Sequence, residues 1–171
     1  IIKPFDLKEL MSVVDRAIET AYLRREVSQF RRKQQQRFSL TRIVGKSEAI
    51  RRVTRTCGRL AESDASTVFL LGESGTGKDL VARAIHFDDS RQEGAFVAVP
   101  CTTFPREVAT SLEQRTQALS RLIGHAAGAF AGADADQDGY VQQAHRGTLF
   151  LDEIGAIPLP LQSHLLRLLT Q

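Results

Sequence analysis

The sequence predicts an α/β fold in which a parallel sheet is flanked by helices. Three observations support this prediction. A glycine-rich loop at 72–79 follows an apolar run at 67–71, a second apolar run at 148–152 ends beside acidic residues, and helix-like stretches separate the candidate strands. Short apolar runs that alternate with helices are typical of parallel sheets, because two parallel strands need a crossover connection.

The candidate elements follow one another along the chain. A first helix is expected from Leu7 to Ala21, since apolar residues recur there at three- and four-residue spacing, with Asp6 as its N-cap. Further helices are expected at 48–61, 78–86, 106–122 and 159–170. The expected strands are 67–71, 96–99 and 148–152.

A phosphate-binding loop is predicted immediately before the 78–86 helix. Its residues are Gly72, Glu73, Ser74, Gly75, Thr76, Gly77 and Lys78. Glycines allow tight turns with positive φ, so that several backbone N–H groups can point into one concavity beside the helix N-terminus. Lys78 would reach the outer phosphates. The alternative is a glycine turn with a solvated lysine, which the flanking apolar run and helix disfavour.

Asp79 follows the loop lysine, where a P-loop usually has Ser or Thr to contact Mg²⁺. A carboxylate would repel a bare triphosphate, but it is tolerated if Mg²⁺ lies between the two. Asp79 is therefore a candidate direct or water-mediated metal contact. The alternative is an acid that stabilises the first turn of a helix.

The run 147–153 has the character of a Walker B strand, because it is apolar and β-branched and ends in Asp152 and Glu153. Open α/β sheets bind ligands at the C-terminal ends of their strands. Asp152 would hold Mg²⁺ through water, and Glu153 would orient and deprotonate the attacking water. The alternative is a pair of surface acids that follows a strand.

Taken together, these motifs resemble the AAA+ ATPases of NtrC-type bacterial enhancer-binding proteins, which activate sigma-54 RNA polymerase. The resemblance rests on Ile43 to Ser47, GESGTGKD at 72–79, ARAIH at 82–86, FVAV at 96–99, Gly124-His125, GAFAGA at 128–133, GTLFLDEIG at 147–155 and LQSHLLRLL at 161–169. It implies that the chain carries part of a P-loop AAA+ domain. In that family an acid after the P-loop lysine is usual.

The resemblance also implies ligands and partners. These are ATP with Mg²⁺, adenine contacts near Val44 and Gly45, a homo-oligomeric ring, and a loop that touches sigma-54 RNA polymerase. The loop residues are Gly128, Ala129, Phe130, Ala131, Gly132 and Ala133. DNA would be read by a further domain and hydrolysis completed by a neighbour's arginines, neither of which lies within these 171 residues.

The sequence departs from the family pattern between the nucleotide and the partner loop. The family's GAFTGA threonine is Ala131, and the asparagine that would bond the catalytic glutamate is Pro100, which has neither side-chain donor nor N–H. About nine additional residues lie between Cys101 and Gly124, and the charged pair usual after His125 is Ala-Ala. Coupling of ATP to sigma-54 is therefore in question.

The chain is expected to contain three parts. Residues 1–22 resemble the end of a receiver domain, in which Lys3 would sense an aspartyl phosphate; an ordinary amphipathic helix after a Lys-Pro turn is the alternative. Residues 23–40 would form a basic helical linker, and its apolar positions make pairing in a dimer plausible. Residues 41–171 would be the N-terminal part of the AAA+ domain.

Charge and composition set further bounds. Residues 24–59 carry a net charge of +10 and the remainder −7, which indicates either a nucleic-acid patch or a solvated linker. Cys57 and Cys101 form no CxxC pair, and neither a signal peptide nor a membrane-length apolar run is visible, so a reduced, cytoplasmic protein is expected. Residues 134–145 match part of a calcium loop but end in His145 instead of a bidentate carboxylate, so an acidic turn is favoured.

Three functions remain open at this point. The chain could come from a two-component, ATP-hydrolysing activator of sigma-54 promoters. It could come from a regulator of the same ancestry that binds ATP but has lost sigma-54 remodelling. A small P-loop kinase or metabolite ATPase is a third possibility, and the receiver-like start and GAFAGA disfavour it.

Overall fold

The computed structural model describes residues 7–63, 65–88, 93–105 and 110–170. The chain divides into two compact units, which meet between Arg37 and Phe38. Lys3 and Asp6, the predicted phosphate sensor and N-cap, lie outside the described residues. The predicted part boundaries at 22 and 40 remain predictions.

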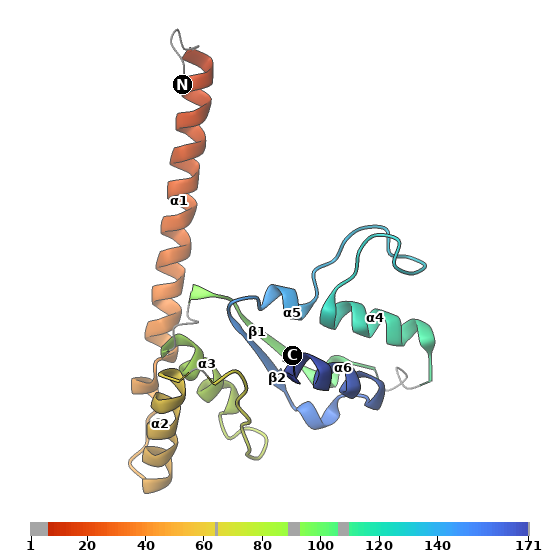
Figure 1. Cartoon of the computed structure of the whole chain (residues 1–171). Helices are drawn as coiled ribbons and strands as arrows, with labels where there is room; N and C mark the ends of the chain where they lie inside the picture. The colour runs from red at the N-terminus through yellow and green to blue at the C-terminus, as the bar shows by residue number, and fades with distance from the viewer. Residues whose placement is uncertain (1–6, 64, 89–92, 106–109, 171) are drawn as a thin grey trace. The chain divides into compact units, whose positions relative to one another are not determined.

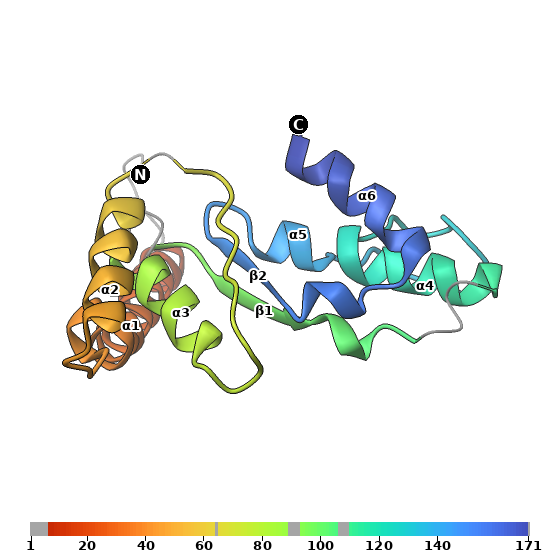
Figure 2. The ribbon, with the colours of Figure 1, turned by 90° about the horizontal axis from the view of Figure 1, so that it is seen from below.

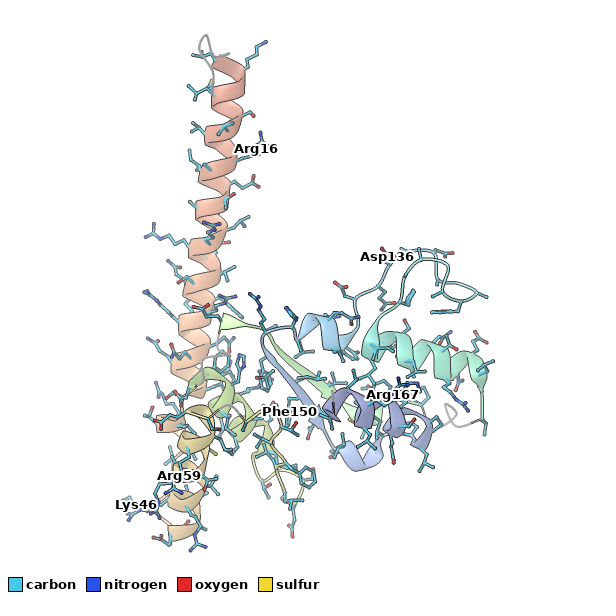
Figure 3. All side chains as sticks on the ribbon, viewed as in Figure 1. Arg16, Lys46, Arg59, Asp136, Phe150 and Arg167 are labelled. Carbon is cyan, nitrogen blue, oxygen red and sulfur yellow. The ribbon has the colours of Figure 1, made fainter. Side chains whose placement is uncertain are left out.

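One long helix, α1, spans Leu7–Phe38 and contains 32 residues (Figure 1). The predicted apolar stripe is present and exposed along it; its members include Leu7, Met11, Val14, Ile18, Val27 and Phe30. Polar side chains on α1 form hydrogen bonds with groups one turn away. Arg16, labelled in Figure 3, donates to the backbone carbonyl and to the hydroxyl of Ser12. The helix therefore continues well beyond the predicted end of the receiver-like segment.

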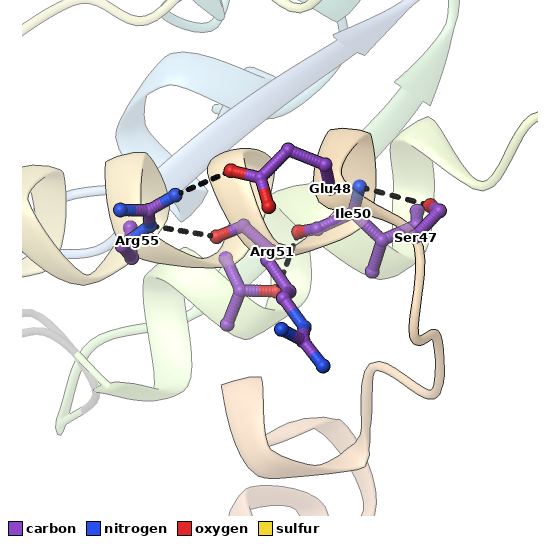
Figure 4. Close-up of polar contacts among 6 residues, drawn as sticks. Ser47, Glu48, Ile50, Arg51 and Arg55 are labelled. Carbon is purple, nitrogen blue, oxygen red and sulfur yellow. Dashed lines mark hydrogen bonds and ion pairs between the residues drawn. The ribbon is translucent and has the colours of Figure 1, made fainter.

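The second unit opens with a short 3-10 helix, η1 (Leu40–Arg42), followed by α2 (Glu48–Ala61), whose bounds match the prediction. Ser47 caps α2 by accepting a hydrogen bond from the Ile50 N–H at 3.3 Å (Figure 4). Arg55 pairs with Glu48 at 3.0 Å on the exposed face. Cys57 and Ala61 form the buried face of α2.

A parallel sheet is formed by β1 (Phe96–Pro100) and β2 (Thr148–Asp152). The register pairs Phe96 with Thr148 and Pro100 with Asp152. Helix α3 (Lys78–Asp88) lies on one side of this sheet (Figures 1 and 2). On the other side lie α4 (Leu112–Ile123), α5 (Tyr140–Gln143) and α6 (Leu159–Thr170). This is the predicted parallel α/β arrangement.

The predicted strand at 67–71 is wrong: the segment has no regular secondary structure. Phe69 is 69% exposed and Leu71 83% exposed, whereas a buried parallel strand is covered on both faces. The reason is pairing, because a strand requires a hydrogen-bonded neighbour. Here β1 and β2 bond each other and not this segment.

The core of the second unit lies where β1 meets α4 (Leu112–Ile123) and α6 (Leu159–Thr170). Its buried residues are Val99, Cys101, Phe104, Ala118, Leu122, Ile157, Leu161 and Leu165. Helix α4 begins later than the predicted 106–122 helix, because Ser111 caps it by accepting from the Gln114 N–H. Residues 106–109 lie outside the described part.

Short helices complete the second unit. The 3-10 helix η3 (Cys101–Thr103) follows β1, α5 (Tyr140–Gln143) precedes β2, and the 3-10 helix η5 (Ile154–Ala156) follows β2. Among the described residues, no helix is long and apolar enough to cross a membrane.

Candidate functional site

The predicted phosphate loop closes around the side chain of Lys78, the first residue of α3. Lys78 Nζ donates to the carbonyl oxygens of Gly72 at 3.0 Å and Glu73 at 2.8 Å. Thr76 Oγ1 donates to the same Glu73 carbonyl at 2.8 Å. The loop is therefore pre-shaped around a cation that can exchange these carbonyls for phosphate oxygens.

Two glycines give the loop its shape and leave space in it. Gly75 and Gly77 have φ of 80° and 90°, a region that L side chains rarely adopt. A Cβ at either position would meet nothing within 4 Å. The space around both glycines at the start of α3 is therefore open, as an anion held by the helix N-terminus would require.

Asp79 is engaged within its own helix. Arg83 Nε donates to both carboxylate oxygens of Asp79 at 3.0 Å, one turn further along α3. Ser74, which was also predicted to bind the nucleotide, lies exposed in the loop before α3. The sequence reasoning identified Asp79 but missed Arg83, whose four-residue spacing from Asp79 was the available signal.

The two candidate acids stand where β2 ends. Asp152 is the last residue of β2, and its Oδ1 accepts a hydrogen bond from the Glu153 N–H at 3.0 Å. Glu153 has φ 51° and ψ 49°, a left-handed conformation that is uncommon for a residue with a Cβ. Such strain at a candidate catalytic residue points to a functional constraint.

The predicted phosphate loop lies at the start of α3, and the two acids lie at the end of β2. His86 Nδ1 and Thr148 Oγ1, 2.9 Å apart, join the C-terminal part of α3 to the first residue of β2. The start of α3 and the end of β2 lie in the same direction from this contact (Figures 1 and 2). Lys78 and Asp152 therefore occupy the same end of the α3–β2 pair.

Pro100 lies directly beside these acids, since the sheet register pairs it with Asp152. The next residue, Cys101, is fully buried. Burial, and secondly the charge of Asp152, raise the pKa of the Cys101 thiol to about 11. The departure at Pro100 thus falls beside Asp152, at the position opposite it in the ladder.

The predicted partner loop is closed at its base. His125 and Gln137 exchange backbone hydrogen bonds of 2.9 Å in both directions, forming an isolated antiparallel bridge. Gln142 fastens the two ends, because its side chain accepts from the Gly139 N–H at 3.0 Å and donates to the Ile123 carbonyl. The sequence reasoning did not single out Gln142.

Within this loop the GAFAGA residues form turns. The Gly128 N–H donates to the Ala133 carbonyl at 2.8 Å, and Ala133 is buried, whereas Ala129, Ala131 and Gly132 are exposed. The ring of Phe130 packs on His125, with centroids 4.8 Å apart. His125 in turn lies 2.5 Å from Ser120 Oγ through its Nδ1. Phe130 is therefore held against the loop base.

The acidic turn that follows supports the loop. Asp136 Oδ1 accepts a hydrogen bond from the Ala127 N–H at 2.7 Å (Figure 3). In the part of the chain that the structure describes, no group of three or more His, Cys, Asp or Glu side chains is placed to hold a metal ion.

The candidate adenine contacts lie just before α2. Val44 is 94% exposed, and a Cβ on Gly45 would collide with the Ile50 side chain of α2. Gly45 is thus required by close packing. The exposed Val44 is available to a ligand or to another segment.

Comparison with known proteins decides the family. The sequence pattern described as "Sigma-54 interaction domain" matches residues 43–171. The chain belongs to the sigma-54 interaction domain family. Its predicted resemblance is confirmed, and its parallel sheet flanked by helices is part of an AAA+ domain.

Individual relatives agree with this assignment. The chain is 40% identical over 171 residues to the regulatory protein AtoC of Escherichia coli, covering 100% of this chain and 35% of AtoC. It is 44% identical over 169 residues to the DNA-binding transcriptional regulator NtrC of a Bradyrhizobium species, covering 99% of this chain and 32% of that protein. The chain thus spans about a third of the length of the curated relatives it matches.

A solved structure matches the same extent. The crystal structure of NtrX from Brucella abortus in complex with ATP has a TM-score of 0.64 and 34% sequence identity, covering 98% of this chain and 32% of NtrX. As a member of this family, the chain is of the NtrC and AtoC type of sigma-54 activators.

Proposed function

We propose that this chain is the nucleotide-binding part of a cytoplasmic, two-component transcriptional regulator that binds and hydrolyses ATP to activate sigma-54 RNA polymerase. The observation that carries the proposal is the loop at 72–77, whose Gly72 and Glu73 carbonyls accept hydrogen bonds from Lys78 at the start of α3. The space around Gly75 and Gly77 of this loop is open. The NtrX structure with ATP, over 98% of this chain, supports ATP as the ligand.

ATP binding is assigned to the loop and the start of α3. Lys78 would exchange the Gly72 and Glu73 carbonyls for phosphate oxygens, and the positive-φ glycines would turn N–H groups toward the same anion. Val44 and Gly45 would contribute to the adenine site. The first test is calorimetry with Mg·ATP, comparing Lys78→Ala with Lys33→Ala, which removes an exposed lysine of α1.

Lys78→Ala should weaken ATP binding by about 10- to 100-fold, because a hydrogen bond to a charged group contributes about 1.5–3 kcal/mol. Lys33→Ala should bind like the wild type. Equal affinity for ATP in the wild type and Lys78→Ala would show that the loop is not the phosphate site.

Hydrolysis is assigned to the two acids after β2. Asp152 is the residue proposed to hold Mg²⁺, which would neutralise phosphate charge when bound. Glu153 is proposed to accept a proton from the attacking water, and its backbone is already fixed by the bond to Asp152. Glu153→Gln should retain ATP binding and lose hydrolysis in the assembled ring, because the amide keeps the shape and removes the base.

The partner contact is assigned to the 128–133 loop, and DNA contact to a domain outside this chain. A second function within the family is favoured by two observations. Ala131 lacks the hydroxyl of the family pattern, and Pro100 stands opposite Asp152 where a side-chain donor would act. On this reading the protein binds ATP but remodels sigma-54 weakly.

Open-complex formation on a sigma-54 promoter by the full-length protein separates the two functions. If coupling is impaired, Ala131→Thr and Pro100→Asn should each raise activity partly and the double variant more, since they repair different points of one path. Full wild-type activity that Ala131→Thr leaves unchanged would exclude the impaired reading. Membership of the sigma-54 family favours either reading over a metabolite kinase.

A further inference from the structure

Arg83 makes contacts that neither the P-loop nor the Walker B pattern accounts for. Its Nε donates to both carboxylate oxygens of Asp79 at 3.0 Å. Its guanidinium carbon lies 4.5 Å from the centroid of the Phe96 ring and 5.1 Å from that of Phe38. The side chain is 27% exposed, compared with 51% for Asp79.

The two aromatic contacts distinguish this ion pair from an ordinary one on a helix surface. An exposed pair four residues apart contributes little, because both side chains lose conformational freedom when they meet. Here Phe96, which begins β1, and Phe38, which begins the second unit, already restrict the guanidinium. Arg83 is thus held in place from elements outside α3, and Asp79 meets a cation that is already positioned.

The position of Asp79 makes this contact relevant to the nucleotide. Asp79 directly follows Lys78, so its carboxylate stands in the first turn of α3 beside the proposed phosphate site. A free carboxylate there would repel a triphosphate. Because Arg83 donates to both carboxylate oxygens, its positive charge offsets the negative charge of Asp79. The carboxylate is also held toward Arg83, one turn further along α3.

We propose that Arg83 is a positioning residue of the nucleotide site: it holds the Asp79 carboxylate and offsets its charge, so that the loop accepts a triphosphate. Asp79 then acts through this ion pair, and Mg²⁺ is left to Asp152. The inference rests on the proposed binding of ATP at residues 72–78. It replaces the expectation that Asp79 contacts the metal.

Calorimetry with ATP and ADP, at low and high salt and with and without Mg²⁺, tests this on the 171-residue chain. The variants are Arg83→Ala, Arg83→Lys, Asp79→Asn and the double variant Arg83→Ala/Asp79→Asn. Arg121→Ala is the matched control, because it removes an exposed arginine in the last turn of α4. Thermal unfolding of each variant is recorded in parallel.

Arg83→Ala should weaken ATP binding about fivefold at low salt, because the Asp79 carboxylate would then repel the phosphate charge. The loss should be smaller for ADP, which carries less charge, and smaller at high salt, which screens the repulsion. Asp79→Asn in the Arg83→Ala background should restore the affinity. Arg83→Lys should retain part of it, since the charge remains while the planar stacking is lost. Arg121→Ala should bind like the wild type.

Several results would overturn the proposal. Unchanged ATP affinity in Arg83→Ala would do so, and a loss that Asp79→Asn does not restore would show a purely structural role. If Arg83→Ala does not fold, Asp79→Asn alone decides: affinity equal to or above the wild type supports the proposal, and a loss seen only with Mg²⁺ makes Asp79 a metal ligand. Absence of ATP binding by the wild type would instead overturn the proposed function and this inference with it.

Discussion

Replacing Glu153 by glycine should stabilise the fold while it removes the proposed catalytic base. Glu153 has φ 51° and ψ 49°, and its side chain is exposed. A left-handed conformation costs a residue with a Cβ about 1–2 kcal/mol, whereas glycine loses about 0.5–1 kcal/mol more backbone entropy on folding. The expected net gain is about 0.5–1 kcal/mol, or roughly 1–4 °C in Tm.

Two variants separate the backbone effect from the loss of the carboxylate. Glu153→Gln removes the charge and retains the strained backbone, so its Tm should equal that of the wild type. Glu62→Gly makes the same substitution at φ −87°, where glycine relieves nothing, and should destabilise the protein by about 0.5–1 kcal/mol. Thermal unfolding followed by circular dichroism gives all four values.

A Tm that Glu153→Gly lowers as Glu62→Gly does would show that the left-handed backbone at Glu153 carries no strain that glycine relieves. Hydrolysis provides a second readout, because Glu153→Gly and Glu153→Gln should both remove the ATP turnover that we propose for the full-length protein. A variant that is more stable and inactive would show that the protein retains strain at this position for function.

Two further predictions concern the core. Leu122→Ala should lower the free energy of unfolding by about 2–5 kcal/mol in a urea titration, because Leu122 is fully buried. Leu112 is 75% exposed, so Leu112→Ala should change this free energy by less than about 0.5 kcal/mol. Equal losses in the two variants would contradict the packing of Leu122 in the core. Because burial and Asp152 raise the pKa of Cys101 to about 11, the native thiol stays protonated while the unfolded thiol ionises near 9, so stability should be intact below pH 9 and fall as pH rises toward 11. Cys101→Ala should reduce that slope, although burial also raises the pKa of Cys57, and an unchanged slope would exclude Cys101 as its source.

Local sequence signals predicted the elements that are stabilised locally. Helix α2 has the predicted bounds because its Ser47 cap and amphipathic pattern are local, and the 78–86 helix differs only at its end, at Asp88. The strands predicted at 96–99 and 148–152 are also present, since both are apolar and pair with each other, and the first ends one residue later, at Pro100. The apolar run at 67–71 had the same local character and formed no strand, because pairing depends on a neighbour that the local sequence does not specify.

The same distinction explains which parts of the candidate site were visible in the sequence. The phosphate loop and the acids Asp152 and Glu153 follow from contiguous motifs. The pairing of Asp79 with Arg83 depends on Phe38 and Phe96, which are 45 residues before and 13 residues after Arg83 in the chain. No local pattern predicts that two such rings meet one guanidinium.

Two pairs of adjacent residues lie at the ends of the two strands: Pro100 and Cys101 at the end of β1, and Asp152 and Glu153 at the end of β2. Pro100 is opposite Asp152, Asp152 fixes the Glu153 backbone, and the Asp152 charge acts on buried Cys101. Cys101 belongs to the core that includes Leu122 of α4, and α4 leads directly into the partner loop at Gly124. A conformational change at Asp152 and Glu153 could therefore reach the predicted partner loop through packed core residues. This connection does not need the side-chain hydrogen bond that Pro100 cannot make. If sigma-54 remodelling survives in this protein, packing at Cys101 and Leu122 is the connection that the structure offers for it.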